Sequence, residues 1–208
     1  NQQISGCLSA DQLIKYGSTR IVFGKDITNS YSSPSVAENN PTTILVKVSH
    51  VAARLDFSQF DVTLKGFEGN PTVVFDEAKF VNLQQNGKIV EGDASVNVKD
   101  GAFLNRSNRI GTKWTDMGTA YGYANQYKQD SEMNTALYVK FTVDGRTFEK
   151  TYPINPAGIT KEVDHNGIKG GYLYDIKVRW TITPDWGDST IEFYTRDWVH
   201  NSIPEIVL

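Results

Sequence analysis

Apolar and polar residues alternate along much of the chain, which is the period expected of half-buried β-strands. The alternation runs through residues 44–48, continues through 51–57 on the opposite parity, and resumes over 60–64. A slip of one residue moves every side chain to the other face of a sheet, so the change near Ser49 and His50 predicts a β-bulge or a bend between sheets.

The clearest local pattern lies at residues 137–154, LYVKFTVDGRTFEKTYPI, where two alternating stretches flank Asp144-Gly145. Glycine tolerates the positive φ that a type I′ turn requires, so this pair predicts a β-hairpin. Alternation also predicts a strand over residues 174–182, and the turn-forming residues 184–188 end it.

Helix signals are confined to one short segment. A capping-box pattern begins at Ser9 and Gly17 follows a small apolar face, which predicts a minor helix over residues 9–16. Residues 28–42 are rich in Ser, Asn and Pro and predict an exposed connector. Many strands with so little helix predict an all-β fold, an antiparallel β-sandwich.

Composition narrows the classes of function. The 208 residues are 39% hydrophobic and 12% aromatic, which suits a globular domain with a substantial core. The formal net charge of −3 leaves no basic footprint for a nucleic-acid partner. No run of about 18 apolar residues predicts a membrane-spanning helix, and a single cysteine excludes an intramolecular disulfide.

Residues that could carry catalysis are scattered. The three histidines, His50, His165 and His200, lie far apart without metal-ligand spacing, and no nucleophile elbow, phosphate loop or zinc-protease helix occurs. Residues 162–167 resemble a calcium loop only in part, because the further carboxylates are missing. The chain is therefore predicted to be no enzyme and to carry no metal or cofactor.

One aromatic stretch, residues 114–127, has two interpretations. Trp114, Tyr121 and Tyr123 could be exposed and stack on sugar rings, which would make them ligand contacts. Alternatively, Tyr121 and Tyr123 alternate on a strand and cover the core of the sandwich.

The last twenty residues are unusually apolar for a chain end. Burying their eight large apolar side chains contributes roughly 12–24 kcal/mol, whereas ordering about twenty residues of backbone costs roughly 20–40 kcal/mol. The segment therefore also needs the hydrogen bonds of a β-ladder. A groove with open strand edges supplies both by β-strand addition, and that groove belongs either to the chain's own sandwich or to another molecule.

Three segments, in this order, resemble strands of the C-terminal domain of Bacteroidota fimbrillins, the subunits of type V pili. VSHVAARLDF (48–57) resembles the opening strand, YLYDIKVRWTI (172–182) a strand near the end, and TIEFYTRDWV (190–199) the final strand with an acidic residue before Trp. Asn125-Gln126-Tyr127 fits the family more loosely. The likeness covers about residues 44–208.

The resemblance implies a transthyretin-like β-sandwich over residues 44–188. Residues 1–43 would then be the remnant of a preceding N-terminal domain or extension, and 189–208 a donor-strand appendage. Fimbrillins are exported as lipoprotein precursors and trimmed by an arginine-specific protease, and the appendage of one subunit enters a groove of the next. On this chain, the inserting residues would be Ile191, Phe193, Trp198, Val199, Ile203, Ile206 and Leu208.

The function implied is that of a structural subunit of a fimbrium at the cell surface, associated with the outer membrane after export. Its partners would be other pilin subunits and, for adhesion, a host protein or glycan. An alternative is a tip or accessory pilin, or an adhesin module that binds protein or glycan. If residues 189–208 serve a neighbour, deleting 190–208 is predicted to leave a folded monomer that cannot polymerise.

Overall fold

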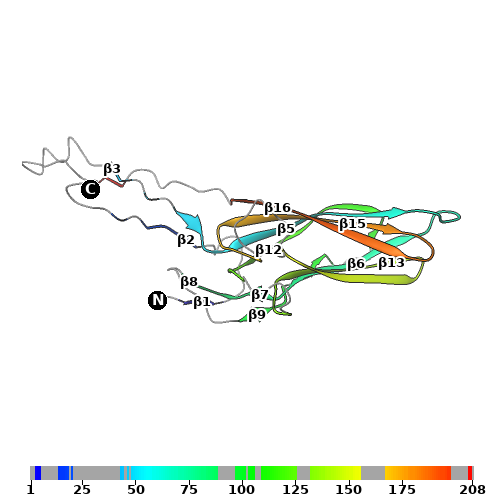
Figure 1. Ribbon diagram of the computed structural model, residues 1–208, viewed down its shortest axis with the longest axis horizontal. Helices are drawn as coiled ribbons and strands as arrows, with labels where there is room; N and C mark the ends of the chain where they lie inside the picture. The colour runs from blue at the N-terminus through cyan, green and yellow to red at the C-terminus, as the bar shows by residue number, and fades with distance from the viewer. Residues whose placement is uncertain are drawn as a thin grey trace, which may run out of the picture.

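The computed structural model describes residues 3–5, 14–18, 20, 43–44, 46, 48–88, 97–101, 103–105, 109–125, 132–155, 167–197 and 206–207. These residues form strands and turns, and no helix occurs among them (Figure 1). The described part of the chain accordingly contains no helix that is long and apolar enough to cross a membrane.

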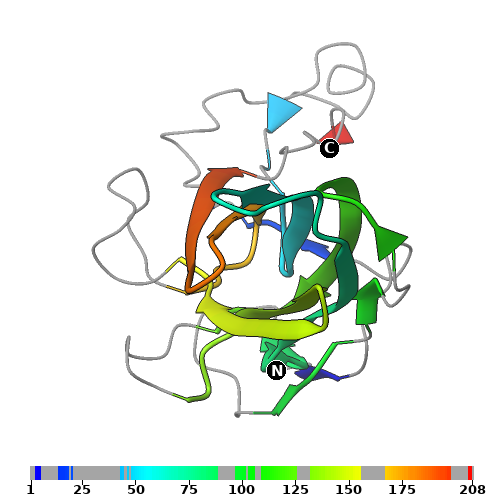
Figure 2. The same cartoon turned by 90° about the vertical axis from the view of Figure 1, so that its right-hand side faces the viewer.

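Two sheets pack face to face in a sandwich (Figure 2). The first contains, in spatial order, β10 (Phe103–Asn105), β6 (Val73–Val81), β13 (Ala136–Val143) and β14 (Arg146–Pro153), with β11 (Arg109–Ile110) also on β6. The second contains β12 (Lys113–Gly122), β5 (Ala53–Leu64), β15 (Tyr172–Ile182) and β16 (Gly187–Asp197). The all-β sandwich predicted from the sequence is confirmed.

One pairing departs from the predicted antiparallel arrangement. β5 and β15 are parallel neighbours, whereas every other pair in the two sheets is antiparallel. Parallel strands need a crossover connection. Here the chain between β5 and β15 forms the strands of the other sheet before it returns. No local pattern in the sequence predicts a parallel pairing of these two strands.

Within the described part of the chain, four short two-stranded pairs lie outside the two sheets. They join β1 (Gln3–Ser5) to β8 (Asn86–Lys88), β2 (Lys15–Tyr16) to β4 (Ser49–His50), β3 (Thr43–Ile44) to β17 (Ile206–Val207), and β7 (Leu83–Gln84) to β9 (Val98–Lys99).

The predicted helix over residues 9–16 is wrong where the structure describes it. Lys15 and Tyr16 pair with His50 and Ser49 as strands, and residues 9–13 lie outside the described part. Short isolated helices are marginal in water, so pairing with β4 overrides the capping-box signal.

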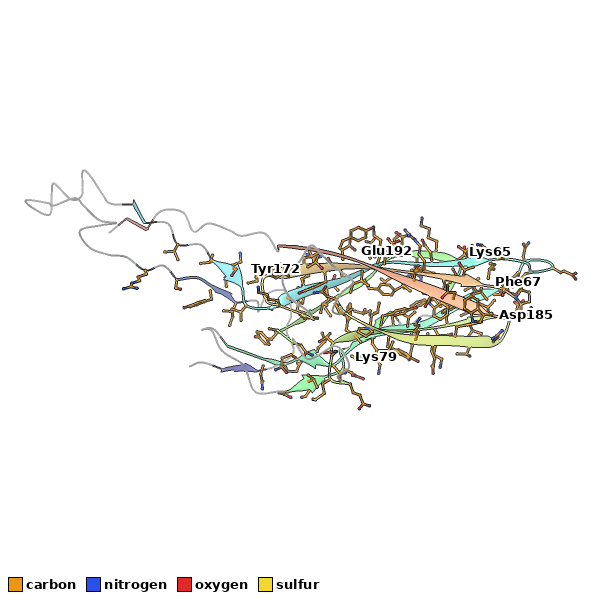
Figure 3. All side chains as sticks on the ribbon, viewed as in Figure 1. Lys65, Phe67, Lys79, Tyr172, Asp185 and Glu192 are labelled. Atoms are coloured by element: carbon orange, nitrogen blue, oxygen red, sulfur yellow. The ribbon has the colours of Figure 1, made fainter. Side chains whose placement is uncertain are left out.

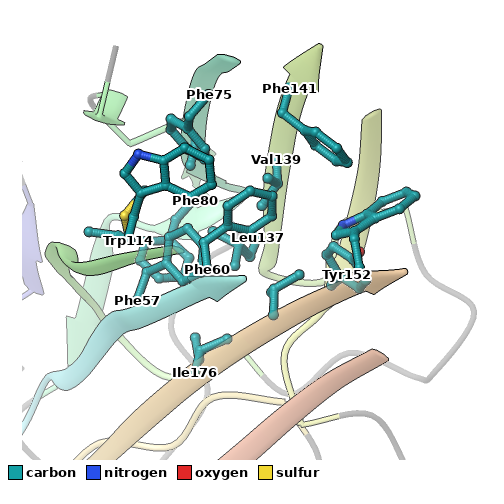
Figure 4. Close-up of a cluster of buried hydrophobic side chains, with 14 of the residues drawn as sticks. Phe57, Phe60, Phe75, Phe80, Trp114, Leu137, Val139, Phe141, Tyr152 and Ile176 are labelled. Carbon is teal, nitrogen blue, oxygen red and sulfur yellow. The ribbon is translucent and has the colours of Figure 1, made fainter. Parts of the chain in front are cut away.

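Aromatic side chains fill the space between the sheets (Figure 4). The ring of Phe60, which is 0% exposed, lies 5.2 Å from that of Phe75, 5.4 Å from Trp114 and 5.3 Å from Phe141, measured between centroids. The core therefore joins strands from both sheets through one connected group of rings.

The local geometry includes a turn that the sequence predicted and a β-bulge that it did not. The hairpin at Asp144-Gly145 is confirmed: β13 and β14 pair through Val143 and Arg146, and both turn residues have positive φ (45° and 83°). Within β5, the register with β15 shifts at Ser58, whose hydroxyl donates to Ile176 O at 3.2 Å. This bulge lets Phe57 and Phe60 both point into the core.

Candidate functional site

The two lateral sides of the sandwich differ. On the closed side, β10 and β11 carry the chain from the first sheet to β12 in the second. Gly111 N donates to Val73 O at 3.1 Å and Val62 N donates to Thr112 O at 2.8 Å, so backbone hydrogen bonds cross this corner. A Cβ at Gly118 would lie only 3.0 Å from Leu104 Cβ, which shows how closely the strands approach.

On the open side, β14 and β16 end their sheets next to each other. Among the described residues, no strand pairs with the outer edge of either one. Side chains join the two edges: Lys150 Nζ donates to Ser189 Oγ at 2.9 Å, and Arg146 Nη1 donates to Pro184 O at 3.3 Å. Unpaired strand edges are where another chain can add a strand, so we take this open side as the candidate site.

Behind the open edges the core is aromatic. Phe148, Tyr152 and Trp180 are at most 9% exposed, and the rings of Phe148 and Trp180 lie 6.0 Å apart. Burial raises the pKa of the Tyr152 hydroxyl to about 12, because the phenolate would lose its hydration. The open side thus has exposed backbone edges over a packed apolar interior.

The strand β16 is held to β15 along its whole length. The ladder runs from Gly187 opposite Ile182 to Asp197 opposite Tyr172. Arg179 of β15 forms an ion pair with Glu192, and Lys177 Nζ lies 4.9 Å from the ring centroid of Tyr194. The Tyr194 hydroxyl donates to Glu192 Oε2 at 3.1 Å, and this hydrogen bond raises the pKa of Tyr194.

This pairing bears on the predicted donor strand, residues 189–208. Residues 189–197, including Ile191 and Phe193, pair through their backbone with β15 of their own chain. The predicted residues Trp198, Val199, Ile203 and Leu208 lie outside the described part of the chain. Ile206 pairs with Ile44, and the adjacent Val207 pairs with Thr43.

The three predicted ligand-contacting aromatics do not form an exposed platform. Trp114 is 4% exposed and packs in the core, and Tyr123 is 2% exposed. Tyr121 is half-buried and lies opposite Arg54 in the second sheet. The placement agrees with the alternative interpretation, in which these residues pack the sandwich.

A large exposed aromatic that the sequence analysis did not single out is Trp186, which is 61% exposed. It lies in the turn between β15 and β16, at the end of the sandwich away from β2 and β4 (Figure 1). The signal in the sequence is a bulky apolar residue inside a Pro-Asp turn, where no strand face is available to bury it.

A concavity of about 220 Å³ lies on the second sheet, where the β12 register shifts between Thr115 and Gly118. Arg54 Nε and Thr119 Oγ1 both donate to Asp56 Oδ1, at 2.9 and 2.7 Å. Asp116 and Asp175 also line it. Among the described residues, no group of three or more His, Cys, Asp or Glu side chains could hold a metal ion.

No protein-family model matches the chain, and no curated protein matches it either. Solved structures do. A candidate cell adhesion protein from Parabacteroides distasonis matches over 73% of this chain and 53% of its own, with 20% identity and a TM-score of 0.57. At this identity, the match shows a shared fold.

Two weaker matches are a candidate cell adhesion protein from Bacteroides eggerthii and a C-terminally truncated tip fimbrial protein from Porphyromonas gingivalis. The first covers 74% of this chain and 57% of its own, with 16% identity and a TM-score of 0.45. The second covers 73% and 52%, with 13% identity and a TM-score of 0.42. This chain therefore spans about half the length of these three solved structures.

Proposed function

We propose that the chain is the C-terminal sandwich of a fimbrillin-like subunit of a cell-surface fimbrium, which polymerises by β-strand addition and supports adhesion. One observation carries the proposal: the open side leaves the outer edge of β16 without a partner among the described residues. From β16 the chain continues into a C-terminal segment that contains Trp198, Val199, Ile203, Ile206 and Leu208.

The proposed donor is shorter than the sequence alone suggested. Residues 187–197 belong to the chain's own sheet, so residues 198–208 are the part left to serve a neighbour. In the isolated chain Ile206 and Val207 pair with Ile44 and Thr43. Such a short two-stranded pairing is marginal in water, so the segment can leave it and add to the open side of another copy.

The shared fold with a candidate cell adhesion protein supports this function. Because the chain spans about half of that protein, we assign residues 1–43 to the end of a preceding domain or extension. Location in a fimbrium associated with the outer membrane, and contact with a host protein or glycan, follow from the same proposal.

Deletion of residues 198–208 tests the proposal. The truncated chain should keep its circular dichroism spectrum and its cooperative melt, because both sheets remain, but light scattering and electron microscopy should detect no polymers. Ile203→Asp with Ile206→Asp should act in the same way at full length. Asn201→Ala with Glu205→Ala is the matched control and should polymerise normally.

Two results would contradict the proposal. Polymers of the truncated chain would show that residues 198–208 are dispensable for assembly. A full-length chain that stays monomeric at every concentration, but binds a host protein or glycan, would favour the tip subunit or adhesin module instead.

A further inference from the structure

The end of the sandwich away from β2 and β4 is built from turns that are tied to one another. We call residues 65–72, 144–146 and 183–188 the distal tip (Figure 3). Lys65 N donates to Ile182 O at 2.9 Å, and Thr72 N donates to Asp144 Oδ1 at 2.7 Å. Arg146 joins the second turn to the third through Pro184 O. The tip is therefore a preorganised surface, which lowers the entropic cost of binding.

Trp186 is presented on the most tightly held of these turns. Thr183 N donates to Trp186 O at 2.7 Å, and Trp186 N donates to Thr183 O at 3.3 Å. Pro184 restricts the turn further. The indole nevertheless remains 61% exposed. A large aromatic ring on a fixed support is typical of the central anchor of a protein–protein interface.

Charge distinguishes the two ends of the molecule. The distal tip carries the exposed carboxylates Glu68, Asp185 and Asp188. Asp144 adds a fourth, against the two cations Lys65 and Arg146, and the Arg146 guanidinium also lies 4.9 Å from the Phe148 ring.

At the opposite end, the described residues of segments 14–20, 43–50 and 167–171 include the three cations Lys15, Arg20 and Lys169, against one carboxylate, Asp197, at the end of β16. The two ends thus have complementary charge, which favours their contact in a defined orientation.

The course of β16 relates these ends to polymerisation. The strand begins at Gly187 in the distal tip and ends at Asp197, opposite Tyr172, at the basic end (Figure 3). The segment that follows therefore leaves from the basic end. In a linear array, the neighbour that this segment reaches lies beyond the basic end and can present its distal tip there.

We propose that the distal tip, centred on Trp186, docks on the basic end of a second copy of this chain. The contact is head-to-tail, so two different surfaces meet and an open filament results. This inference rests on the proposed function and adds to it the surface that orients each subunit on the next.

Sedimentation velocity of the full chain over a concentration series tests the contact. Trp186→Ala should weaken self-association by about tenfold or more, as expected when an anchor residue is lost. Tyr138→Ala is the matched control, because Tyr138 lies on the outer face of β13, an interior strand of the first sheet away from the tip, and it should leave association unchanged. Circular dichroism melts should show that both variants fold.

A mixing experiment exploits the two different surfaces. Lys15→Glu with Arg20→Glu should weaken association on its own, as Trp186→Ala does. An equimolar mixture of the two variants should form heterodimers with near wild-type affinity, because one variant keeps an intact basic end and the other an intact tip. The heterodimer should not extend further.

Other outcomes overturn the inference. Trp186→Ala that assembles like the wild type, a mixture that fails to form heterodimers, or loss of glycan binding with unchanged assembly would each do so. If deletion of residues 198–208 abolishes polymers while Trp186→Ala does not, the tip contact fails and the proposed strand addition stands. If Trp186→Ala weakens association and the deletion does not, the reverse holds.

Discussion

The two sheets are connected differently on the closed and the open side of the sandwich. On the closed side the chain itself passes between the sheets, and backbone hydrogen bonds at Gly111 and Val62 join them. On the open side, as far as the structure describes it, side-chain hydrogen bonds such as that of Lys150 with Ser189 connect β14 to β16. A covered corner cannot accept another strand, whereas an edge bridged by side chains can.

Because of this difference, a partner strand can bind on one side without unfolding the domain and cannot do so on the other. A partner at the closed side would have to displace backbone hydrogen bonds whose donors would then be buried without acceptors. A partner at the open side would exchange exposed side-chain contacts, each of which contributes little in water. The proposed strand addition therefore uses the side that the chain leaves uncovered.

The largest loss of stability is expected when β16 is removed from the open side. Deletion of residues 187–208 removes β16 with its eleven paired residues. The expected loss in the free energy of unfolding is on the order of 10 kcal/mol, at about 1 kcal/mol per hydrogen bond. This is comparable with the whole stability of a domain, about 5–15 kcal/mol. The truncated chain should lose its cooperative melt, in contrast to the chain ending at residue 197. A normal melt would show that β16 is an accessory strand.

A second test compares two buried tryptophans. Trp114 packs toward the closed side against Phe60 and Phe75, and Trp180 packs toward the open side against Phe141 and Phe148. Replacement of either by Ala should destabilise the fold by about 3–5 kcal/mol in urea unfolding. The destabilisation by Trp180→Ala should lie at the lower end of this range, because the uncovered strand edge can move into the cavity that the indole leaves. The opposite order would contradict the assignment of the two sides.

Alkaline pH should affect the open side through Tyr152. Its pKa is raised from 10.0 to about 12 by burial, so its contribution to stability is complete below pH 10 and is lost as the pH rises through 12. Between these values the wild type should lose up to about 1.4 kcal/mol per pH unit more than Tyr152→Phe. Urea titrations at pH 9, 10 and 11 measure this, and parallel slopes would exclude it.

The smallest effect is expected for the ion pair on the outer face. Glu192→Gln removes the charge that faces Arg179, whose side chain is 48% exposed. The expected loss is about 0.2–1 kcal/mol in chemical unfolding, and it should shrink at high salt because the pair is screened. Arg54 with Asp56 is a comparable exposed pair. A loss above 2 kcal/mol at Glu192 would indicate that this pair anchors β16.

Local patterns predicted the individual elements well. The Asp144-Gly145 hairpin, the alternating strand before Pro184 and the buried aromatics of β5 all follow from periodicity and turn chemistry. The helix prediction was wrong at Lys15 and Tyr16, the described part of residues 9–16 that pairs with β4, since a short helical signal is weaker than strand pairing. The aromatic stretch had two interpretations, and the burial of Trp114 and Tyr123 favours packing in the core over ligand contact. Alternation alone does not say which face of a strand is inside.

The all-β class of the fold follows from the sequence alone, because period-two alternation and glycine turns are properties of neighbouring residues. Which strands pair and which lie at an edge depends on the tertiary structure. The parallel pairing of β5 with β15 and the inclusion of residues 187–197 in the chain's own sheet are examples. They depend on contacts between residues far apart in the chain, which no local pattern encodes.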